Sequence, residues 1–280
     1  MIHRVEYLMG TAIGIDIRDA DVREVTVKKA FLRLAAIEAR FSTYRPDSEV
    51  SRYGRGEIGD CDLSTEVREV LARCEAVRIR SGGAFDVRRH RPDGILDPSG
   101  FVKGWAVDEA AVVLERGGAR NYAINAGGDI LARGEPSPGR RWRVGVQHPQ
   151  IREALAAVID VGDLAVATSG AYERGEHVVD ARTGAPPRDV MSVTVAGPTL
   201  AFADAYATTA FAMGADGIRW INGLPGYAGC LVTTDGRLVW TEAFEPLLVR
   251  SGIGAPPAPS ASIPSDSLGE RSARVGPRSG

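Results

Sequence analysis

The sequence contains little cysteine and no long apolar run, and these shortages exclude several classes of protein. It holds 3 cysteines in 280 residues, and none lies in a Cys-x-x-Cys or Cys/His pairing. Neither a disulfide framework nor a zinc site is therefore predicted. No stretch reaches the roughly 20 apolar residues that a membrane helix needs, and the first residues, Met1–Glu6, lack the apolar segment of a signal peptide. We expect a cytoplasmic protein that does not insert into a membrane.

The sequence also lacks an excess of charge of one sign. Its 34 basic residues nearly balance its 36 acidic ones, for a formal net charge of −2. No broad positive field results, so binding to nucleic acid is not expected. An Arg-rich segment, 88–91, is expected on a solvated loop. Because 44% of the residues are apolar and 25% are charged, the chain can bury a sizeable core and is predicted to be globular.

The last thirty residues differ in composition from the rest. Residues 251–280 include 17 Ser, Gly or Pro and almost no large apolar side chain. Such a segment cannot offset the conformational entropy that it would lose on ordering. We therefore predict one domain over residues 1–250 and a disordered Ser/Gly/Pro-rich tail over residues 251–280.

Before this tail, strand-like and helix-like patterns alternate along the chain. Gly10–Ile17 and Tyr122–Asn125 have the pattern of strands, whereas Val25–Phe41 and Val67–Ser81 have the apolar spacing of amphipathic helices. The same patterns predict helices at Gly104–Gly117 and Thr199–Met213, and strands at Trp142–Val146, Val190–Val195 and Ala228–Thr233. The predicted fold class is α+β, with mixed sheets flanked by helices.

The helix predicted at Thr199–Met213 carries the most informative pair of side chains. Asp204 and Thr208 lie four residues apart, so they project from one face of the helix. Both offer hard oxygen atoms, and such a pair can hold one side of a Mg²⁺ ion whose other ligands are water, a carbonyl and a phosphate. The alternative is structural: Asp204 would interact favourably with the helix dipole from the first turn, and the Thr208 hydroxyl would donate a hydrogen bond to a preceding backbone carbonyl.

Several glycine-containing turns are candidates for binding a ligand. The run Leu96–Ala106 joins a loop to a helix start, where free N–H groups and Lys103 suit a phosphate, although an ordinary capped turn has the same pattern. Three further turns, 81–86, 123–129 and 167–170, let the backbone approach a ligand closely or simply turn tightly. The Gly127–Gly128 pair does not match the Gly-x-Gly-x-x-Gly fingerprint, and the sequence shows no Gly-x-Ser-x-Gly elbow.

Two further residues have side chains suited to catalysis or stacking. His177 begins His177–Asp180, which we predict to be a strand, and its imidazole is suited to proton transfer near neutral pH. A lone histidine also serves structural roles. Tyr44 offers a ring for stacking on a planar ligand, or one that covers the edge of a core.

Taken together and in this order, seven sequence blocks resemble the ApbE family of FAD:protein FMN transferases. The resemblance spans about residues 5–245, and the order of the blocks is more specific than any single one. The blocks are Met9–Thr11; Phe41–Tyr44 with Ser48–Arg52; Gly83–Asp86; Asp97–Asp108; Asn125–Asp129; Ala167–Arg174 with His177–Gly184; and Ser192–Gly214.

The resemblance implies a single α+β domain that binds FAD and Mg²⁺, with Mn²⁺ as an alternative metal. It implies transfer of FMN to a threonine hydroxyl of a client protein that carries a flavinylation motif, with release of AMP. The implied metal ligands are Asp204, Thr208 and the carbonyl of Gly100, and His177 is a candidate acceptor of the threonine proton. The implied FAD-binding residues are Met9, Tyr44, Ala84, Phe85, Asp86, Asp97, Lys103 and Val179.

The sequence departs from the family pattern at several points. Ala171 replaces an acidic residue, only two residues separate Arg174 from His177, and Val87–His90 replaces a Pro-Thr pair. A lipoprotein signal, frequent in the family, is not predicted at the start of this sequence. Two alternative functions stay open: an FAD pyrophosphatase in which water replaces the threonine, and a carrier that binds FAD without turning it over.

Overall fold

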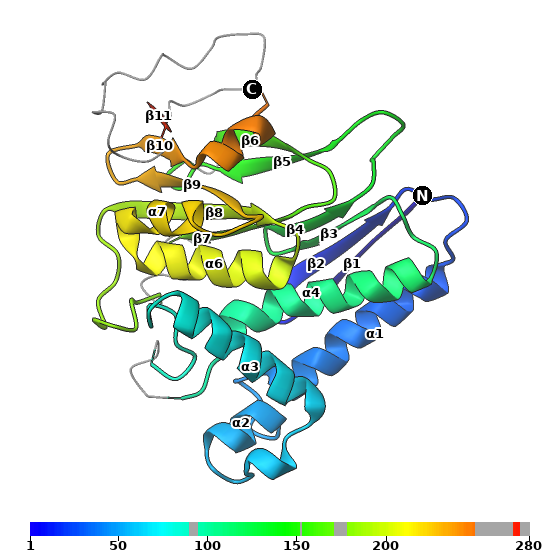
Figure 1. The fold of residues 1–280 in the computed structure, drawn as a ribbon. Helices are drawn as coiled ribbons and strands as arrows, with labels where there is room; N and C mark the ends of the chain where they lie inside the picture. The colour runs from blue at the N-terminus through cyan, green and yellow to red at the C-terminus, as the bar shows by residue number, and fades with distance from the viewer. Residues whose placement is uncertain (90–94, 152, 171–177, 250–270, 275–280) are drawn as a thin grey trace.

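The computed structural model describes residues 1–89, 95–151, 153–170, 178–249 and 271–274. It consists of one large sheet, one two-stranded sheet and a layer of helices (Figure 1), so the predicted α+β class is confirmed. All described strand pairs are antiparallel. The large sheet has the order β1 (Ile2–Leu8), β2 (Thr11–Ile17), β3 (Tyr122–Ala126), β4 (Asp129–Arg133), β7 (Ala165–Gly170), β8 (Val190–Gly197), β9 (Ala228–Thr233), β10 (Arg237–Trp240), β11 (Arg271–Arg274); β5 (Trp142–Gln147) pairs with β6 (Leu155–Val161).

The helices match the predicted segments closely, with one exception. The helix expected from Gly104 begins five residues earlier, at Ser99, because the Asp97 carboxylate accepts the Ser99 N–H and Pro98 is compatible with a helix start. Gly100 and Lys103 therefore lie within the helix and not in a loop before it. The helices are α1 (Glu24–Phe41), α2 (Glu49–Gly54), α3 (Thr65–Arg80), α4 (Ser99–Arg116), α6 (Leu200–Ala212) and α7 (Gly217–Asn222), with 3-10 turns at Asp60–Asp62, Gly214–Asp216 and Glu242–Leu247.

The main core lies between the large sheet and the helices α1, α4 and α6. Alternate residues of β2, namely Ile13, Ile15 and Ile17, are fully buried against this helical layer, as the period of two along a strand requires. Figure 1 shows α1 and α4 crossing the sheet near β1–β3, with α6 in front of β7 and β8. A second, smaller core joins the other face of the sheet to β5 and β6, around Ile159, Val232 and Phe244.

A tight turn at Met9 and Gly10 connects β1 to β2. Both residues have positive φ, 54° for Met9 and 73° for Gly10, as in the primed turns that suit the twist of a two-residue hairpin. Met9 is the only non-glycine residue in this region of φ among those described. Its backbone N–H donates to the Glu38 carboxylate on α1, 2.8 Å away, so the turn is fastened to the helical layer.

Helices α4 and α6 approach each other so closely that no side chain fits between them at Gly104. A Cβ on Gly104 would lie 2.3 Å from the Leu200 carbonyl oxygen. Asp108, one turn further along α4, accepts the backbone N–H groups of Leu200 and Ala201 at 2.9 Å each. These N–H groups need an outside acceptor because Thr199 supplies no side-chain cap. Asp108 therefore anchors the start of α6.

The environment of Asp108 also affects its ionisation. Burial raises the pKa of Asp108 more than its hydrogen bonds from Ala201 and Leu200 lower it, so the pKa lies above its usual range. The contact between the helices thus includes a carboxylate that is held largely out of water.

Some predictions concern residues that the structure does not describe. The predicted tail, 251–280, lies outside the described residues except for Arg271–Arg274, which pair with β10 as β11. Of the Arg-rich segment, Arg88 and Arg89 are exposed in a turn, and residues 90 and 91 lie outside the described ranges. Among the described residues, no helix has both the length and the apolar character that crossing a bilayer requires.

Gly104→Ala should destabilise the fold by about 2 kcal/mol or more, because its Cβ would overlap the Leu200 backbone and push α4 away from α6. This loss should exceed the roughly 1 kcal/mol that alanine gains over glycine in a helix. Urea unfolding would measure it, with Gly162→Ala as the control, since a Cβ at Gly162 meets open space. Equal stability of the two variants would contradict the proposed tight contact.

Asp108→Ala should cost about 2 kcal/mol of unfolding free energy, because two N–H groups at the start of α6 lose their acceptor. Denaturant unfolding of this variant beside Asp21→Ala, which removes an exposed carboxylate, provides the measurement. A loss no larger than that of Asp21→Ala would show that Asp108 does not anchor α6.

Candidate functional site

Helix α6 presents Asp204 and Thr208 toward α4, one helical turn apart. Asp204 is buried, with 4% of its surface exposed, and one of its carboxylate oxygens lies 3.8 Å from the Lys103 ammonium. The Thr208 hydroxyl lies 3.1 Å from the hydroxyl of Ser169 at the end of β7. The structural alternative for this pair finds no support, because Asp204 lies beyond the first turn and the hydroxyl that bonds a carbonyl one turn back belongs to Thr209.

The first turn of α4 lies against the same face of α6. A Cβ on Gly100 would be 3.6 Å from both the Thr208 hydroxyl oxygen and the Phe85 ring, so the Gly100 backbone lies beside Thr208. Lys103 follows almost one turn later and reaches Asp204. We call Gly100, Lys103, Asp204 and Thr208 the α4–α6 cluster. It brings together the three residues predicted as metal ligands and one residue predicted to bind FAD.

Asp129 adds a second buried carboxylate beside this cluster. It is 2% exposed, and its Oδ2 lies 2.6 Å from the Lys103 ammonium while its Oδ1 accepts the Thr168 N–H at 3.0 Å. A two-residue turn at Gly127 and Gly128, both with positive φ, places Asp129 at the first position of β4. Sequence reasoning included Asp129 in a matching block but gave it no role.

The donor atoms around the cluster fit a magnesium ion. Mg²⁺ prefers hard oxygen ligands and accepts an incomplete protein shell, with water and phosphate in the remaining positions. Here the Asp204 carboxylate and the Thr208 and Ser169 hydroxyls offer oxygen atoms, and the Gly100 backbone lies beside Thr208. Among the described residues, no three His, Cys, Asp or Glu side chains gather into a metal-binding group.

The segment Ala84–Asp86 lies beside α4 through contacts of its backbone and ring. The Ala84 carbonyl accepts the Ala181 N–H at 3.2 Å, and the Phe85 ring lies next to Gly100. Asp86 accepts the Arg88 N–H at 2.8 Å, whereas the Asp97 N–H donates to the Val87 carbonyl. Four residues of the predicted FAD site, Ala84, Phe85, Asp86 and Asp97, therefore lie together next to the first turn of α4.

The strand predicted at His177–Asp180 is wrong for the residues that the structure describes. Val178, Val179 and Asp180 form no strand, because the chain enters a turn that Asp180 closes with the Arg182 side chain and backbone. Burial raises the pKa of Asp180, but the hydrogen bonds from Arg182 outweigh it and leave the pKa below its usual range. Val179 is half-buried in this segment. His177 and Ala171 lie outside the described residues.

Met9 and Tyr44 lie near the C-terminal end of α1, where their contacts are with α1 and the loop after it. The Met9 N–H donates to Glu38, and the Tyr44 N–H donates to the Ser42 hydroxyl. Tyr44 is 86% exposed, so its ring covers no core and stays open for stacking. The edge-to-face pair of Phe41 and Trp105 joins this end of α1 to α4.

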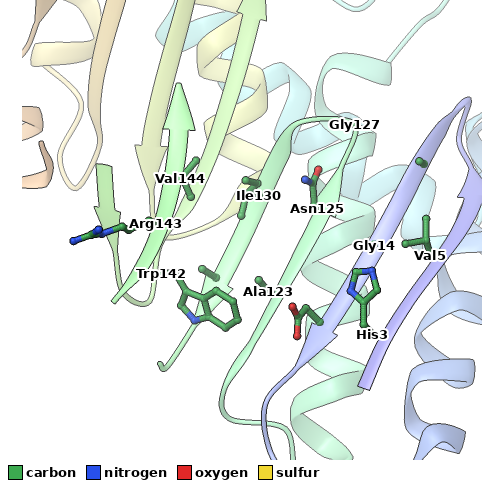
Figure 2. Close-up of a pocket in the computed structure, with 13 residues that line it drawn as sticks. His3, Val5, Gly14, Ala123, Asn125, Gly127, Ile130, Trp142, Arg143 and Val144 are labelled. Atoms are coloured by element: carbon green, nitrogen blue, oxygen red, sulfur yellow. The ribbon is translucent and has the colours of Figure 1, made fainter. Parts of the chain in front are cut away.

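A cavity of about 480 Å³ lies on the other face of the large sheet (Figure 2). Its floor is formed by outward-facing small residues such as Gly14 and Ala123, with Trp142 and Val144 of β5 along one side and His3 of β1 along the other. None of the predicted metal-binding or FAD-binding residues lines it. The cavity is therefore separate from the α4–α6 cluster, which lies on the helical side of the sheet.

Sequence reasoning missed the contributions of Ser169 and Asp129. Ser169 belongs to a predicted glycine turn but had no catalytic signature, and only the fold brings it within 3.1 Å of Thr208. For Asp129, the available signal was an acidic residue directly after two glycines, which fixes it at the start of a strand. Neither pattern by itself indicates which helix the side chain will meet.

Comparisons with known proteins match this chain over most of its length. The model of the ApbE family matches residues 9–90 and 87–231. The FAD:protein FMN transferase of Klebsiella pneumoniae (strain 342) is 31% identical over 169 residues, covering 57% of this chain and 48% of that protein. The protein of the same name from Haemophilus influenzae is 28% identical over 276 residues, covering 74% and 79%. The chain thus spans about half the length of the first relatives that it matches.

Solved structures resemble the fold over almost their whole length. The flavin transferase ApbE from Vibrio cholerae has a TM-score of 0.77 at 25% identity, covering 88% of this chain and 99% of that one. The apbe protein from Thermotoga maritima has a TM-score of 0.80 at 22% identity, with 89% and 99% covered, and supports the fold alone. The family match over residues 9–231, together with this shared fold, shows that the chain belongs to the ApbE family.

Proposed function

We propose that this protein transfers FMN from FAD to a threonine hydroxyl of a client protein, with release of AMP, at a magnesium site in the α4–α6 cluster. The observation that carries the proposal is that Gly100 of α4 lies beside Thr208 of α6, one turn from Asp204, because the fold brings hard oxygen donors from two distant helices to one place. The names of the relatives, FAD:protein FMN transferases, support the transfer of FMN from FAD to a protein.

In this proposal the residues of the cluster act mainly by position and charge. Asp204, Thr208 and the Gly100 carbonyl hold Mg²⁺, with Mn²⁺ as an alternative. Bound there, the metal supplies positive charge that neutralises the pyrophosphate of FAD and the departing AMP. Lys103, with 23% of its side chain exposed, adds a cation at the same edge. The first turn of α4 adds the positive end of the helix dipole, which favours an anion there.

The remaining predicted residues would hold the rest of FAD. Phe85 lies against Gly100 of the α4–α6 cluster, Asp86 follows it in the chain, and Asp97 lies beside Val87. The exposed Tyr44 ring is available for stacking, near the turn that contains Met9. His177 as proton acceptor, Val179 as an FAD contact and a cytoplasmic location stay predictions from the sequence.

One experiment separates this function from its alternatives. The purified protein is incubated with FAD and Mg²⁺, with and without a threonine-bearing acceptor domain, while AMP release and acceptor mass are followed. We expect a metal-dependent gain of one FMN on the acceptor. AMP without a gain in mass would indicate an FAD pyrophosphatase, and intact bound FAD under all conditions would indicate a carrier.

Asp204→Ala should abolish FMN transfer, because it removes the charged ligand of the metal while leaving an apolar helix face that still packs. Acceptor mass after incubation with FAD and Mg²⁺ measures transfer, and circular dichroism checks the fold. Asp216→Ala, which removes a carboxylate with an 81% exposed side chain, is the control and should transfer at the normal rate. An unchanged rate in Asp204→Ala would refute the assigned metal site.

Thr208→Val should raise the Mg²⁺ concentration needed for half-maximal transfer by about tenfold, since a neutral ligand is lost without a change in shape. Thr209→Val is the matched control, because the neighbouring hydroxyl bonds the Ala205 carbonyl and should leave the metal requirement unchanged. Chelation with EDTA should stop transfer in the wild type, and added Mg²⁺ should restore it. Identical Mg²⁺ curves for the two threonine variants would exclude Thr208 as a ligand.

A further inference from the structure

Lys103 lies between two buried carboxylates at unequal distances. Its ammonium is 2.6 Å from Asp129 and 3.8 Å from Asp204. The side chains of the carboxylates are only 2% and 5% exposed, whereas that of Lys103 is 23% exposed. An ammonium and a divalent cation compete for the same carboxylate, because each neutralises its charge. Which carboxylate holds Lys103 therefore affects whether Asp204 can serve a metal.

Asp129 is held in an orientation that favours its pairing with Lys103. Its Oδ1 accepts the Thr168 N–H at 3.0 Å, which turns Oδ2 toward the ammonium. The backbone is equally constrained, since Asp129 pairs with Ala126 across the turn at Gly127 and Gly128. Strand β4 thus fixes the carboxylate before any ligand arrives.

Resting on the function proposed above, we propose that Asp129 is a positioning residue that draws the Lys103 ammonium toward itself and so weakens its competition with a divalent cation for Asp204. Without the charge of Asp129, the ammonium still has the Asp204 carboxylate 3.8 Å away. The lysine then competes with the metal. With Asp129 in place, Lys103 remains beside the metal site as a cation for an anionic substrate.

Mn²⁺ binding tests this role without relying on turnover. Mn²⁺ is titrated into the full-length protein and followed by electron paramagnetic resonance, with and without FAD and with no acceptor. Asp129→Asn keeps an oxygen for the Thr168 N–H and should weaken Mn²⁺ binding about tenfold or more. Asp163→Asn, which also alters a carboxylate that accepts one backbone N–H, is the matched control and should bind Mn²⁺ normally.

A double-mutant cycle with Lys103→Met separates the positioning role from a direct effect of the charge. Lys103→Met alone should bind Mn²⁺ as tightly as the wild type or more tightly, because the competing ammonium is gone. In that background, Asp129→Asn should weaken binding by less than about twofold. Equal weakening of Mn²⁺ binding in both backgrounds would mean that Asp129 acts through its own charge, which would overturn the proposal. Weaker Mn²⁺ binding by Lys103→Met alone would also overturn it, and this second test does not require Asp129→Asn to fold.

Transfer kinetics give a second readout that a merely structural role would not produce. Asp129→Asn should raise the Mn²⁺ concentration for half-maximal transfer while kcat at saturating Mn²⁺ changes by less than about twofold. A fall in kcat alone contradicts the proposal. If the wild type neither binds Mn²⁺ nor transfers FMN, the proposed function itself fails; if it does both and Asp129→Asn matches it, only the role of Asp129 fails.

Discussion

The close contact between α4 and α6 is the constraint on which the candidate site depends. Gly104 lets the two backbones meet, and Asp108 holds the first N–H groups of α6. Because the helices run in opposite directions, fixing Asp108 at the start of α6 also fixes Gly100 beside Thr208. The two ends of the helix contact therefore have different roles. At one end Asp108 holds the start of α6, and at the other end Gly100 lies beside the oxygen donors of α6.

Charge decides what this arrangement is suited to bind. Asp129 and Asp204 place two buried carboxylates beside the Lys103 ammonium. Buried carboxylates are costly unless positive charge lies near them, so this place suits a bound cation. The positive end of the α4 dipole and Lys103 meanwhile favour an anion at the adjacent edge. A metal ion together with a phosphate group would supply both the cation and the anion that these charges favour.

Local patterns in the sequence predicted most of the elements but not how they meet. Apolar periodicity located α1, α3 and α6 to within two residues, because each buries one face. The start of α4 was placed too late, since glycines in its first turns resemble a loop, and their purpose becomes clear only from the contact with α6. The strand expected at His177–Asp180 is wrong over its described residues, 178–180, because the Asp180–Arg182 pair closes a turn, a contact that periodicity does not reveal. Asp204 and Thr208 were candidates from their helical spacing and Gly100 from the resemblance alone, whereas Ser169 and Asp129 needed the long-range pairing of β4 and β7.

The distance along the chain between the two halves of the α4–α6 cluster has a consequence for biosynthesis. Gly100 and Lys103 leave the ribosome about a hundred residues before Asp204 and Thr208, and strands β3 to β8 are made in between. A nascent chain therefore has no complete set of oxygen donors until α6 has emerged and docked against α4. Contacts of such high sequence separation form slowly, because the intervening chain must first be ordered. Metal capture would accordingly follow the assembly of the sheet and would come late in the maturation of the protein.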